Sequence, residues 1–328
     1  MAPLLEVQNL HAAHQGEGGT VPVLNGVDIT LEAGETLGIV GESGSGKTIL
    51  VRALLGLLRP PWRTDVGRVL FDGQDLLAKS EEELRALRGR VIALTTPEPR
   101  KHLNPLLRIG EQIVNVVQAH SDASRRAAYT RAEELLRAVG IPDPRQRLSS
   151  YPHEMSGGMC QRVIIAMALA HSTRLLLADE PTAGLDVTTS RQILDLMLDL
   201  ARDFDTALIL VSRDLGVVAH YCERVAVMFA GQIVETASVP SFFTGAAHPY
   251  SRHLIRAAAA ARDTSLVAAT IARESSARAP DAGCAYAVRC PVALARCRSE
   301  RPRLEPLTEG RAASCFRKAE VAAARVEA

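Results

Sequence analysis

A chain of 328 residues is long enough to bury a large core and to form two domains. Its formal net charge of +1 gives no overall attraction to nucleic acid or to an anionic membrane, and an apolar content of 47% is ordinary for a globular protein. No apolar run reaches 18 residues and the N-terminus has no basic stretch before an apolar core, so neither a transmembrane helix nor a signal peptide is predicted. We therefore expect a cytosolic protein, in which cysteines are more often free or metal-bound than paired in disulfides.

Hydrophobic periodicity predicts strands and helices in alternation. The strands expected before the long helical region lie at 4–10, 22–32, 36–41 and 67–72, with a helix from about Lys47 to Leu58. Residues 81–169 follow a mostly helical pattern. The later elements expected are strands at 174–179, 206–212 and 224–229, a helix at 189–203, and a turn into a short strand at 230–235. This order predicts an α/β fold with a parallel sheet and a helical insertion.

The stretch GESGSGKT fits the phosphate-loop pattern G-x-x-x-x-G-K-[ST] between an apolar strand and a helix. Backbone N–H groups and a helix N-terminus would surround phosphate oxygens. Lys47 would reach the β- and γ-phosphates of ATP, and Thr48 would place its hydroxyl on Mg²⁺. A glycine turn that binds nothing is the alternative. The expected nucleotide-binding residues are Gly41, Glu42, Ser43, Gly44, Ser45, Gly46, Lys47 and Thr48.

The stretch LLLADEPTAGLD, residues 175–186, is a strand that ends in two carboxylates. Parallel sheets bind ligands at the carboxyl ends of their strands, so we expect both carboxylates to face the phosphate loop. Asp179 suits Mg²⁺, and Glu180 suits the general base that polarises the attacking water. The alternative is that the two residues only cap the following helix.

The stretch YPHEMSGGMCQR, residues 151–162, precedes an apolar helix. Ser156, Gly157 and Gly158 would form a second anion site at its N-terminus, which calls for a second nucleotide or a second subunit. With the phosphate loop, the acidic strand and AGLD at 183–186, the chain resembles the ATP-binding cassette (ABC) ATPases over about residues 4–245.

That resemblance implies a P-loop fold with a RecA-like core, an antiparallel β portion and a helical subdomain. In this family two cassettes pack head to tail, and each ATP lies between the phosphate loop of one and the signature of the other. We expect a cassette over 1–257, with the helical subdomain at about 98–170.

A narrower resemblance rests on four segments, namely SGGMCQR, LNPLLRIGEQI (103–113), residues 214–235 and HPYSRHL (248–254). These look like ATPase subunits of oligopeptide/dipeptide importers, with nickel and glutathione importers as close relatives. The resemblance implies a different second ATPase subunit, two transmembrane permease subunits and an extracytoplasmic solute-binding protein, at the cytoplasmic face of the membrane and without nucleic acid. The alternative, a soluble ABC ATPase acting on nucleic acid or ribosomes, usually carries two cassettes or a long coiled-coil insertion.

An Ala/Arg/Ser-rich linker is expected at 258–280, followed by a tail at 281–328 with the spacing C-x5-C-x6-C-x17-C. Four thiolates suit an iron–sulfur cluster or structural zinc, although no C-x2-C pair supports zinc, and reduced thiols are a third possibility. The resemblance to peptide importers, which extends through RCP, implies a [4Fe–4S] cluster. Cys160 and Cys222 are expected to be buried or half-buried thiols. The expected cluster ligands are Cys284, Cys290, Cys297 and Cys315.

Three positions depart from the family pattern. Pro97 stands where relatives have a glutamine and offers no side-chain donor or acceptor. Arg213 replaces the histidine that contacts the γ-phosphate in relatives; arginine holds phosphate charge but lacks a neutral donor/acceptor role. His14 stands where an aromatic ring usually stacks on adenine. Pro97 and Arg213, set against the intact signature, predict a subunit that binds ATP, hydrolyses it poorly and completes a partner's site. The alternative is that the substitutions are tolerated.

Overall fold

The structure is a computed structural model that describes residues 2–260, 282–308 and 310–324. The chain forms two compact units. The first consists mainly of Asp75–Val211 together with Leu31–Glu35, and the second of Leu4–Thr30, Thr36–Gln74 and the chain from Ser212 onward. Most of the predicted linker lies outside the described residues; its first three residues belong to helix α11, Pro249–Ala260.

The first unit contains a parallel sheet of β6 (Ile92–Thr95), β7 (Leu175–Asp179) and β8 (Ala207–Ser212), with β7 in the middle. Every residue of β7 is buried, as its continuous apolar run predicts for a strand covered on both faces. The register places Asp179 opposite Val211, at the carboxyl end of the sheet.

The helices of the first unit begin mostly at serine or aspartate N-caps, whose side chains accept backbone N–H groups of the first turn. These helices are α2 (Glu81–Leu87), α3 (Pro99–His102), α4 (Ile109–Ala119), α5 (Arg125–Ala138), α6 (Pro144–Arg147), α7 (Gly157–Ala168) and α8 (Val187–Asp203). The helical region predicted at 81–169 is thus present, but it also contains the strand β6.

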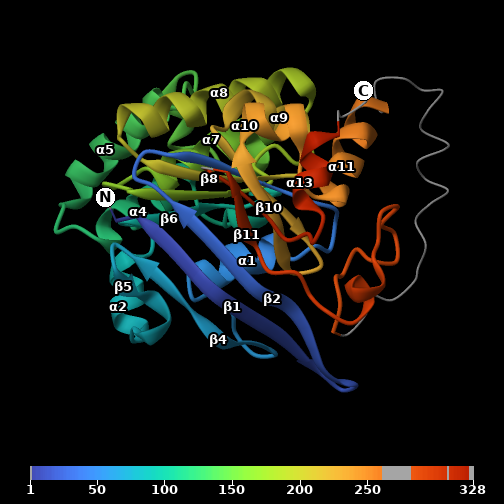
Figure 1. The fold of residues 1–328 in the computed structure, drawn as a ribbon. Helices are drawn as coiled ribbons and strands as arrows, with labels where there is room; N and C mark the ends of the chain where they lie inside the picture. Colours follow the sequence, from blue (N-terminus) through green and yellow to red (C-terminus); the bar gives the residue numbers. More distant parts are fainter. Residues whose placement is uncertain (1, 261–281, 309, 325–328) are drawn as a thin grey trace. The chain divides into compact units, whose positions relative to one another are not determined.

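The second unit contains an antiparallel sheet and part of a mixed sheet. The antiparallel strands β1 (Leu5–Gly16), β2 (Gly19–Leu31) and β4 (Trp62–Phe71) run side by side in Figure 1, with β1 in the centre and the short β5 (Gln74–Asp75) beyond β4. The other strands, in the order β11 (Glu305–Thr308), β12 (Arg311–Ala313), β10 (Gln232–Ser238), β9 (Arg224–Phe229) and β3 (Thr36–Val40), are antiparallel except for the parallel pair β9 and β3.

The core of the second unit gathers around Phe242, Tyr250 and Tyr286, so residues before and after the predicted linker share one apolar cluster. The helices of this unit are α1 (Lys47–Leu54), α9 (Leu215–Tyr221), α10 (Val239–Gly245), α11 and α13 (Lys318–Ala323). Helix α1 ends earlier than predicted because Gly56 takes a left-handed conformation, and the N–H of Leu57 returns to the Arg52 carbonyl.

Several sequence predictions need correction. Strands β1, β2 and β4 are longer than expected. Strands β1 and β2 continue into the glycine-rich stretch between them, and β4 pairs with the extended β1 as far as His14 opposite Trp62. The tail contains two strands and a helix that the sequence did not predict. Since β12 pairs with β10, the expected cysteine-rich extension is not confirmed as a separate element.

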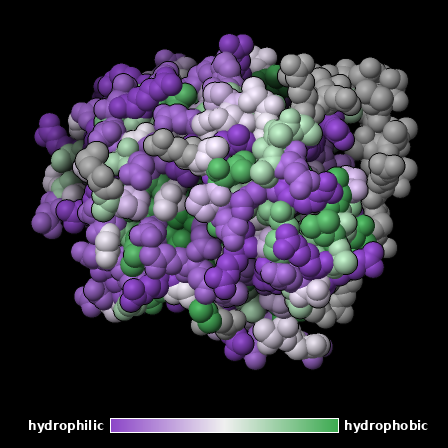
Figure 2. Space-filling model, in the orientation of Figure 1, coloured by the Kyte–Doolittle hydropathy of each residue, from purple (hydrophilic) through white to green (hydrophobic). Residues whose placement is uncertain are grey.

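Hydrophilic residues dominate the face of the molecule shown in Figure 2, and apolar residues form small patches there. Among the described residues, no helix combines the length and the hydropathy needed to cross a bilayer.

Candidate functional site

The phosphate loop lies between β3 and α1 in the second unit, as predicted. It wraps around the buried ammonium group of Lys47, whose Nζ donates to the carbonyl oxygens of Gly41 and Glu42 at 2.8 and 2.9 Å and lies 3.3 Å from Ser45 Oγ. Gly41 cannot carry a side chain here, because a Cβ would lie 2.1 Å from the Met228 carbonyl oxygen. The loop therefore has a fixed path around a central cation, an arrangement that suits a polyphosphate.

The remaining loop residues lead directly into the helix. Gly46 is the N-cap of α1, and the first turn of this helix contains no acidic residue that would neutralise its positive end. The carbonyl of Ser45 accepts the N–H of Gly231 at 2.9 Å, so the turn between β9 and β10 braces the loop. Ser43 and Gly44 are exposed, and Thr48 is half-buried. The predicted strand, loop and helix are thus all present in the second unit.

Asp179 and Glu180 lie at the carboxyl end of β7 in the first unit. Asp179 is buried, and Glu180 is half-buried. Glu180 has a φ of 43°, a left-handed conformation that is unusual for a non-glycine residue, and its N–H donates to the Val211 carbonyl at 3.0 Å. Neither residue caps the following helix, because the N-cap of α8 is Asp186. A strained acidic residue at a strand end is typical of functional sites.

The signature residues form the start of α7 in the first unit. Ser156 is the exposed N-cap, and its Oγ accepts the N–H of Met159 at 3.2 Å. At Gly158 a Cβ would lie 2.6 Å from Thr189 Cγ2, so this glycine lets α7 approach the start of α8 closely. The side chain of Asp186 accepts both the N–H and the hydroxyl of Thr189, and these hydrogen bonds lower the pKa of Asp186. The signature helix and the AGLD segment thus meet in one unit.

The three positions that depart from the family pattern belong to different elements of the chain. Pro97 follows β6 in the first unit and is half-buried. Arg213 is exposed at the end of β8, immediately before the α9 N-cap Asp214. His14 lies on β1 with its ring 4.7 Å from that of Trp62, so an aromatic ring accompanies the histidine where adenine stacking was expected.

The four tail cysteines line a common small cavity in the second unit. The N–H of Cys284 donates to the Cys297 carbonyl at 2.8 Å. Burial, with a further contribution from the charge of the neighbouring cysteines, raises the pKa of Cys315 to about 11. Among the described residues, however, no group of three or more His, Cys, Asp or Glu side chains has the arrangement needed to hold a metal ion. The predicted [4Fe–4S] cluster is therefore not confirmed.

The other two cysteines follow the prediction. Cys160 is buried, and burial raises the pKa of its thiol. Cys222 is partly buried, and burial raises the pKa of this thiol to about 12. Neither thiol is poised to ionise near neutral pH.

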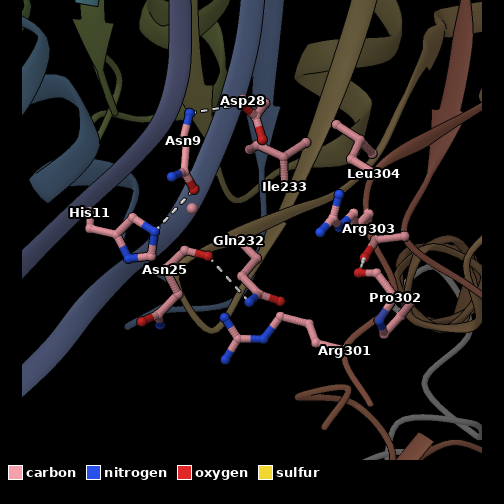
Figure 3. Close-up of a pocket in the computed structure, with 12 residues that line it drawn as sticks. Asn9, His11, Asn25, Asp28, Gln232, Ile233, Arg301, Pro302, Arg303 and Leu304 are labelled. Carbon is pink, nitrogen blue, oxygen red and sulfur yellow. Dashed lines mark hydrogen bonds between the residues drawn. The ribbon is translucent and has the colours of Figure 1, made fainter. Parts of the chain in front are cut away.

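A polar cavity of about 560 Å³ lies elsewhere in the second unit (Figure 3). Asn9 and His11 of β1 line it, with Asn9 Oδ1 3.1 Å from His11 Nε2, and Arg301 of the tail points toward Asn25 and Gln232. No residue of the phosphate loop lines this cavity, so it is not the nucleotide site.

Two residues that contact the phosphate loop were not predicted from the sequence. The hydroxyl of Tyr250 and the guanidinium of Arg289 both bind Glu42. They belong to the segments HPYSRHL and RCP, which carry the resemblance to peptide importers but do not indicate a contact with the loop.

Two protein families match the chain: the ABC transporter family over residues 24–183, and the oligopeptide/dipeptide transporter C-terminal region over residues 234–297. A probable peptide ABC transporter ATP-binding protein of Sinorhizobium fredii is 45% identical over 97% of this chain and 96% of its own length. The oligopeptide transport ATP-binding protein OppD of Bacillus subtilis is 49% identical over 77% of this chain and 71% of its own length. The dipeptide transport ATP-binding protein DppD of Escherichia coli is 40% identical over 95% of this chain and 96% of its own length.

Among solved structures, the chain is similar to the dimeric bacterial ABC transporter cassette MJ0796, with a TM-score of 0.65 and 25% identity over 72% of this chain and 98% of that chain. The ABC transporter family model covers the phosphate loop and the signature, and the Sinorhizobium fredii relative covers nearly the whole chain. The chain therefore belongs to the ABC transporter ATP-binding proteins, which are ATPases, in the group that carries the oligopeptide/dipeptide transporter C-terminal region.

Proposed function

We propose that this chain is the ATP-binding subunit of an importer that takes up peptides. The observation that carries the proposal is a complete phosphate loop around Lys47 in a chain whose relatives are peptide transport ATP-binding proteins. The subunit would work at the cytoplasmic face of the membrane with two permease subunits and an extracytoplasmic solute-binding protein.

The test is ATP-driven uptake by the purified transporter in lipid vesicles. A labelled oligopeptide should accumulate, and uptake should require ATP. Accumulation of nickel or glutathione instead of peptide would assign the chain to a related importer. Co-purification of nucleic acid or ribosomes instead of membrane subunits would overturn the proposal.

Each proposed site residue would have its own role in ATP hydrolysis. MgATP supplies the γ-phosphoryl group and the metal ion. Lys47 and the loop N–H groups would hold phosphate oxygens, and Thr48 and Asp179 would bind the metal ion. Glu180 would accept the proton of the attacking water through its carboxylate. The half-buried position of Glu180 suits a base that is reached by one water and shielded from bulk solvent.

We further propose that this subunit's own site is degenerate and that its signature completes the site of a second, different ATPase subunit. The support is that Pro97 and Arg213 replace a glutamine and a histidine, whereas Ser156, Gly157 and Gly158 keep the family pattern. The dimeric cassette MJ0796 supports pairing in general. A cassette over residues 1–257, with its helical subdomain at 98–170 and a tail from 281, is part of the same proposal.

Glu180→Gln is expected to lower ATP turnover of the assembled transporter by about twofold at most. At a working site, loss of a general base costs on the order of a hundredfold or more, so a small loss indicates that this site contributes little. Turnover is measured as phosphate release, with the equivalent glutamate variant of the partner subunit as the matched control. Loss of nearly all turnover on Glu180→Gln, with the partner's glutamate dispensable, would show that the asymmetry runs the other way.

We also propose that the four tail cysteines hold a [4Fe–4S] cluster in the cell. The support is their C-x5-C-x6-C-x17-C spacing and the single cavity that they line. As placed in the described part of the chain, the four side chains form no metal-holding group, so the proposal requires that they rearrange when iron binds. Burial raises the pKa of three of these thiols, Cys284, Cys290 and Cys315, so a cation that favours the thiolate form would have to accompany their ionisation.

Protein purified without oxygen is expected to be brown and to contain about four iron atoms per chain. Cys290→Ser should remove the iron, and Cys160→Ser, the matched control outside the cavity, should not. Iron content and the visible absorption spectrum are the measurements. If the protein contains zinc and no iron, the cysteines form a structural zinc site instead of a cluster. If it contains neither metal, they are four reduced thiols.

A further inference from the structure

Glu42, the second residue of the phosphate loop, is held by two side chains from the C-terminal region of the chain. Its backbone N–H donates to the hydroxyl oxygen of Tyr250 at 2.9 Å. Its carboxylate accepts two hydrogen bonds from Arg289, at 3.1 Å from Nη1 to Oε2 and at 3.0 Å from Nη2 to Oε1. Two separate segments therefore meet at one residue of the loop.

Tyr250 has a fixed position in the core. It is fully buried, its ring lies 4.4 Å from that of Phe229 and 5.4 Å from that of Tyr286, and its N–H donates to His248 Nδ1 at 3.1 Å. Burial lowers the pKa of His248 to about 3, so this histidine is neutral and keeps a lone pair for the Tyr250 N–H. Burial also raises the pKa of Tyr250, which keeps the hydroxyl protonated. The hydroxyl thus meets Glu42 from a rigid support.

Arg289 lies on the same aromatic cluster. Its guanidinium carbon is 5.8 Å from the centre of the Phe229 ring and 5.5 Å from that of Tyr286. The paired hydrogen bonds to Glu42 raise the pKa of Arg289 further. The side chains of Arg289 and Glu42 are 20% and 36% exposed, so water screens this pair only in part. Two parallel hydrogen bonds and two aromatic faces define the position of the guanidinium.

The charges of Glu42 and Arg289 explain how this contact would affect nucleotide binding. A carboxylate within a loop that receives a polyphosphate repels it, unless a cation balances the carboxylate. Arg289 supplies that cation from outside the loop and holds the carboxylate of Glu42 with two hydrogen bonds.

We infer that Arg289 and Tyr250 are positioning residues for the phosphate loop, and that the C-terminal region thereby sets the affinity of this subunit for nucleotide. The inference rests on the proposed binding of ATP by this loop. Arg289 directly precedes Cys290, so the path of the chain around the cysteine cavity also determines where the guanidinium lies.

The test compares MgATP affinity of the full chain and its variants by isothermal titration calorimetry. Arg289→Gln is expected to weaken binding about fivefold, the effect of one partly exposed charge pair. Glu42→Gln alone removes the repelling charge together with the charged partner of Arg289, so it should weaken binding less than Arg289→Gln does. Arg289→Gln combined with Glu42→Gln should recover part of the affinity that Arg289→Gln alone loses, because no unbalanced carboxylate remains in the loop.

Matched controls separate charge balance from damage to the fold. Arg296→Gln removes an exposed tail arginine whose guanidinium lies over Phe316, so affinity should not change. Arg289→Lys should recover part of the affinity, because the charge remains and the fork is lost. A double variant as weak as Arg289→Gln would overturn the inference, as would equal losses for Arg289→Gln and Arg296→Gln.

Failure of the inference is distinguishable from failure of the proposed function. Lys47→Ala weakens MgATP binding if the loop is the nucleotide site. If Lys47→Ala weakens binding and Arg289→Gln does not, only the positioning role is wrong. If neither variant changes the affinity, the proposed nucleotide site is wrong, and the positioning role is wrong with it.

Discussion

Lys47→Ala is expected to weaken MgATP binding by about a hundredfold. A hydrogen bond from a charged donor contributes on the order of 1.5–3 kcal/mol, and a hundredfold change corresponds to about 2.7 kcal/mol. The ammonium of Lys47 is buried and donates to the loop carbonyls, so water screens its charge only weakly. Calorimetric titration of the full chain with MgATP measures the loss.

The control for this variant is Lys101→Ala, which removes an exposed lysine that pairs only with Glu98 among the salt bridges of the structure's described residues. Its affinity for MgATP should equal that of the unaltered protein. Thermal unfolding without nucleotide should show whether the Lys47→Ala loop still folds, because the substitution also frees the carbonyls of Gly41 and Glu42. Unchanged MgATP affinity in a folded Lys47→Ala variant would refute the assignment of the loop.

Ser156→Arg is expected to lower ATP turnover of the assembled transporter by about a hundred- to a thousandfold. Positioned electrostatic contacts to a reacting phosphate contribute about 3–4 kcal/mol, and the start of α7 would provide them to the partner's site. The substitution removes the hydroxyl that accepts the Met159 N–H, and it adds a long side chain next to Gly157 and Gly158. Phosphate release from the transporter in vesicles is the measurement.

Ser124→Arg is the matched control, because Ser124 is also an exposed N-cap whose Oγ accepts a backbone N–H, that of Ala127 at 3.3 Å in α5. Both variants lose one helix cap, which costs about 1 kcal/mol of stability. Only the Ser156 variant should lose turnover. Equal turnover in the two variants would mean that this signature serves no catalytic site and that the subunit has a regulatory role.

The parts of the fold that a local pattern determines were predictable. The apolar run of β3, the glycine loop and the start of α1 follow one another in the sequence and in the structure. Strand β6 was missed because it has only four residues within a region of helical periodicity. Strands β11 and β12 have only four and three residues, and they form because β10 offers an edge to pair with, which no local pattern reveals.

The candidate site was predictable only in its motifs. Residue type and spacing identified Lys47, Asp179, Glu180 and Ser156 as the residues to inspect. The contact between Glu42 and Arg289 joins residues 247 positions apart. Charged residues are common on protein surfaces, so neither residue type indicated that these two would meet. The tail was predicted to be a separate extension, whereas its Tyr286 packs in the same core as Tyr250.

The pairing of β10 with β12 has a consequence for the order of events during synthesis. Glu235 of β10 pairs with Ala313 of β12, and the N–H of Ser314 donates to the Val234 carbonyl at 2.8 Å. About 80 residues separate the two strands, so at roughly 5–20 residues per second β10 waits on the order of 4–16 seconds on the ribosome before β12 emerges. During that interval β10 presents a bare strand edge, which is the kind of surface that pairs with other chains. The nascent chain is therefore most exposed to aggregation after its ATP-binding motifs have been made, and the last strands to be synthesised end that exposure.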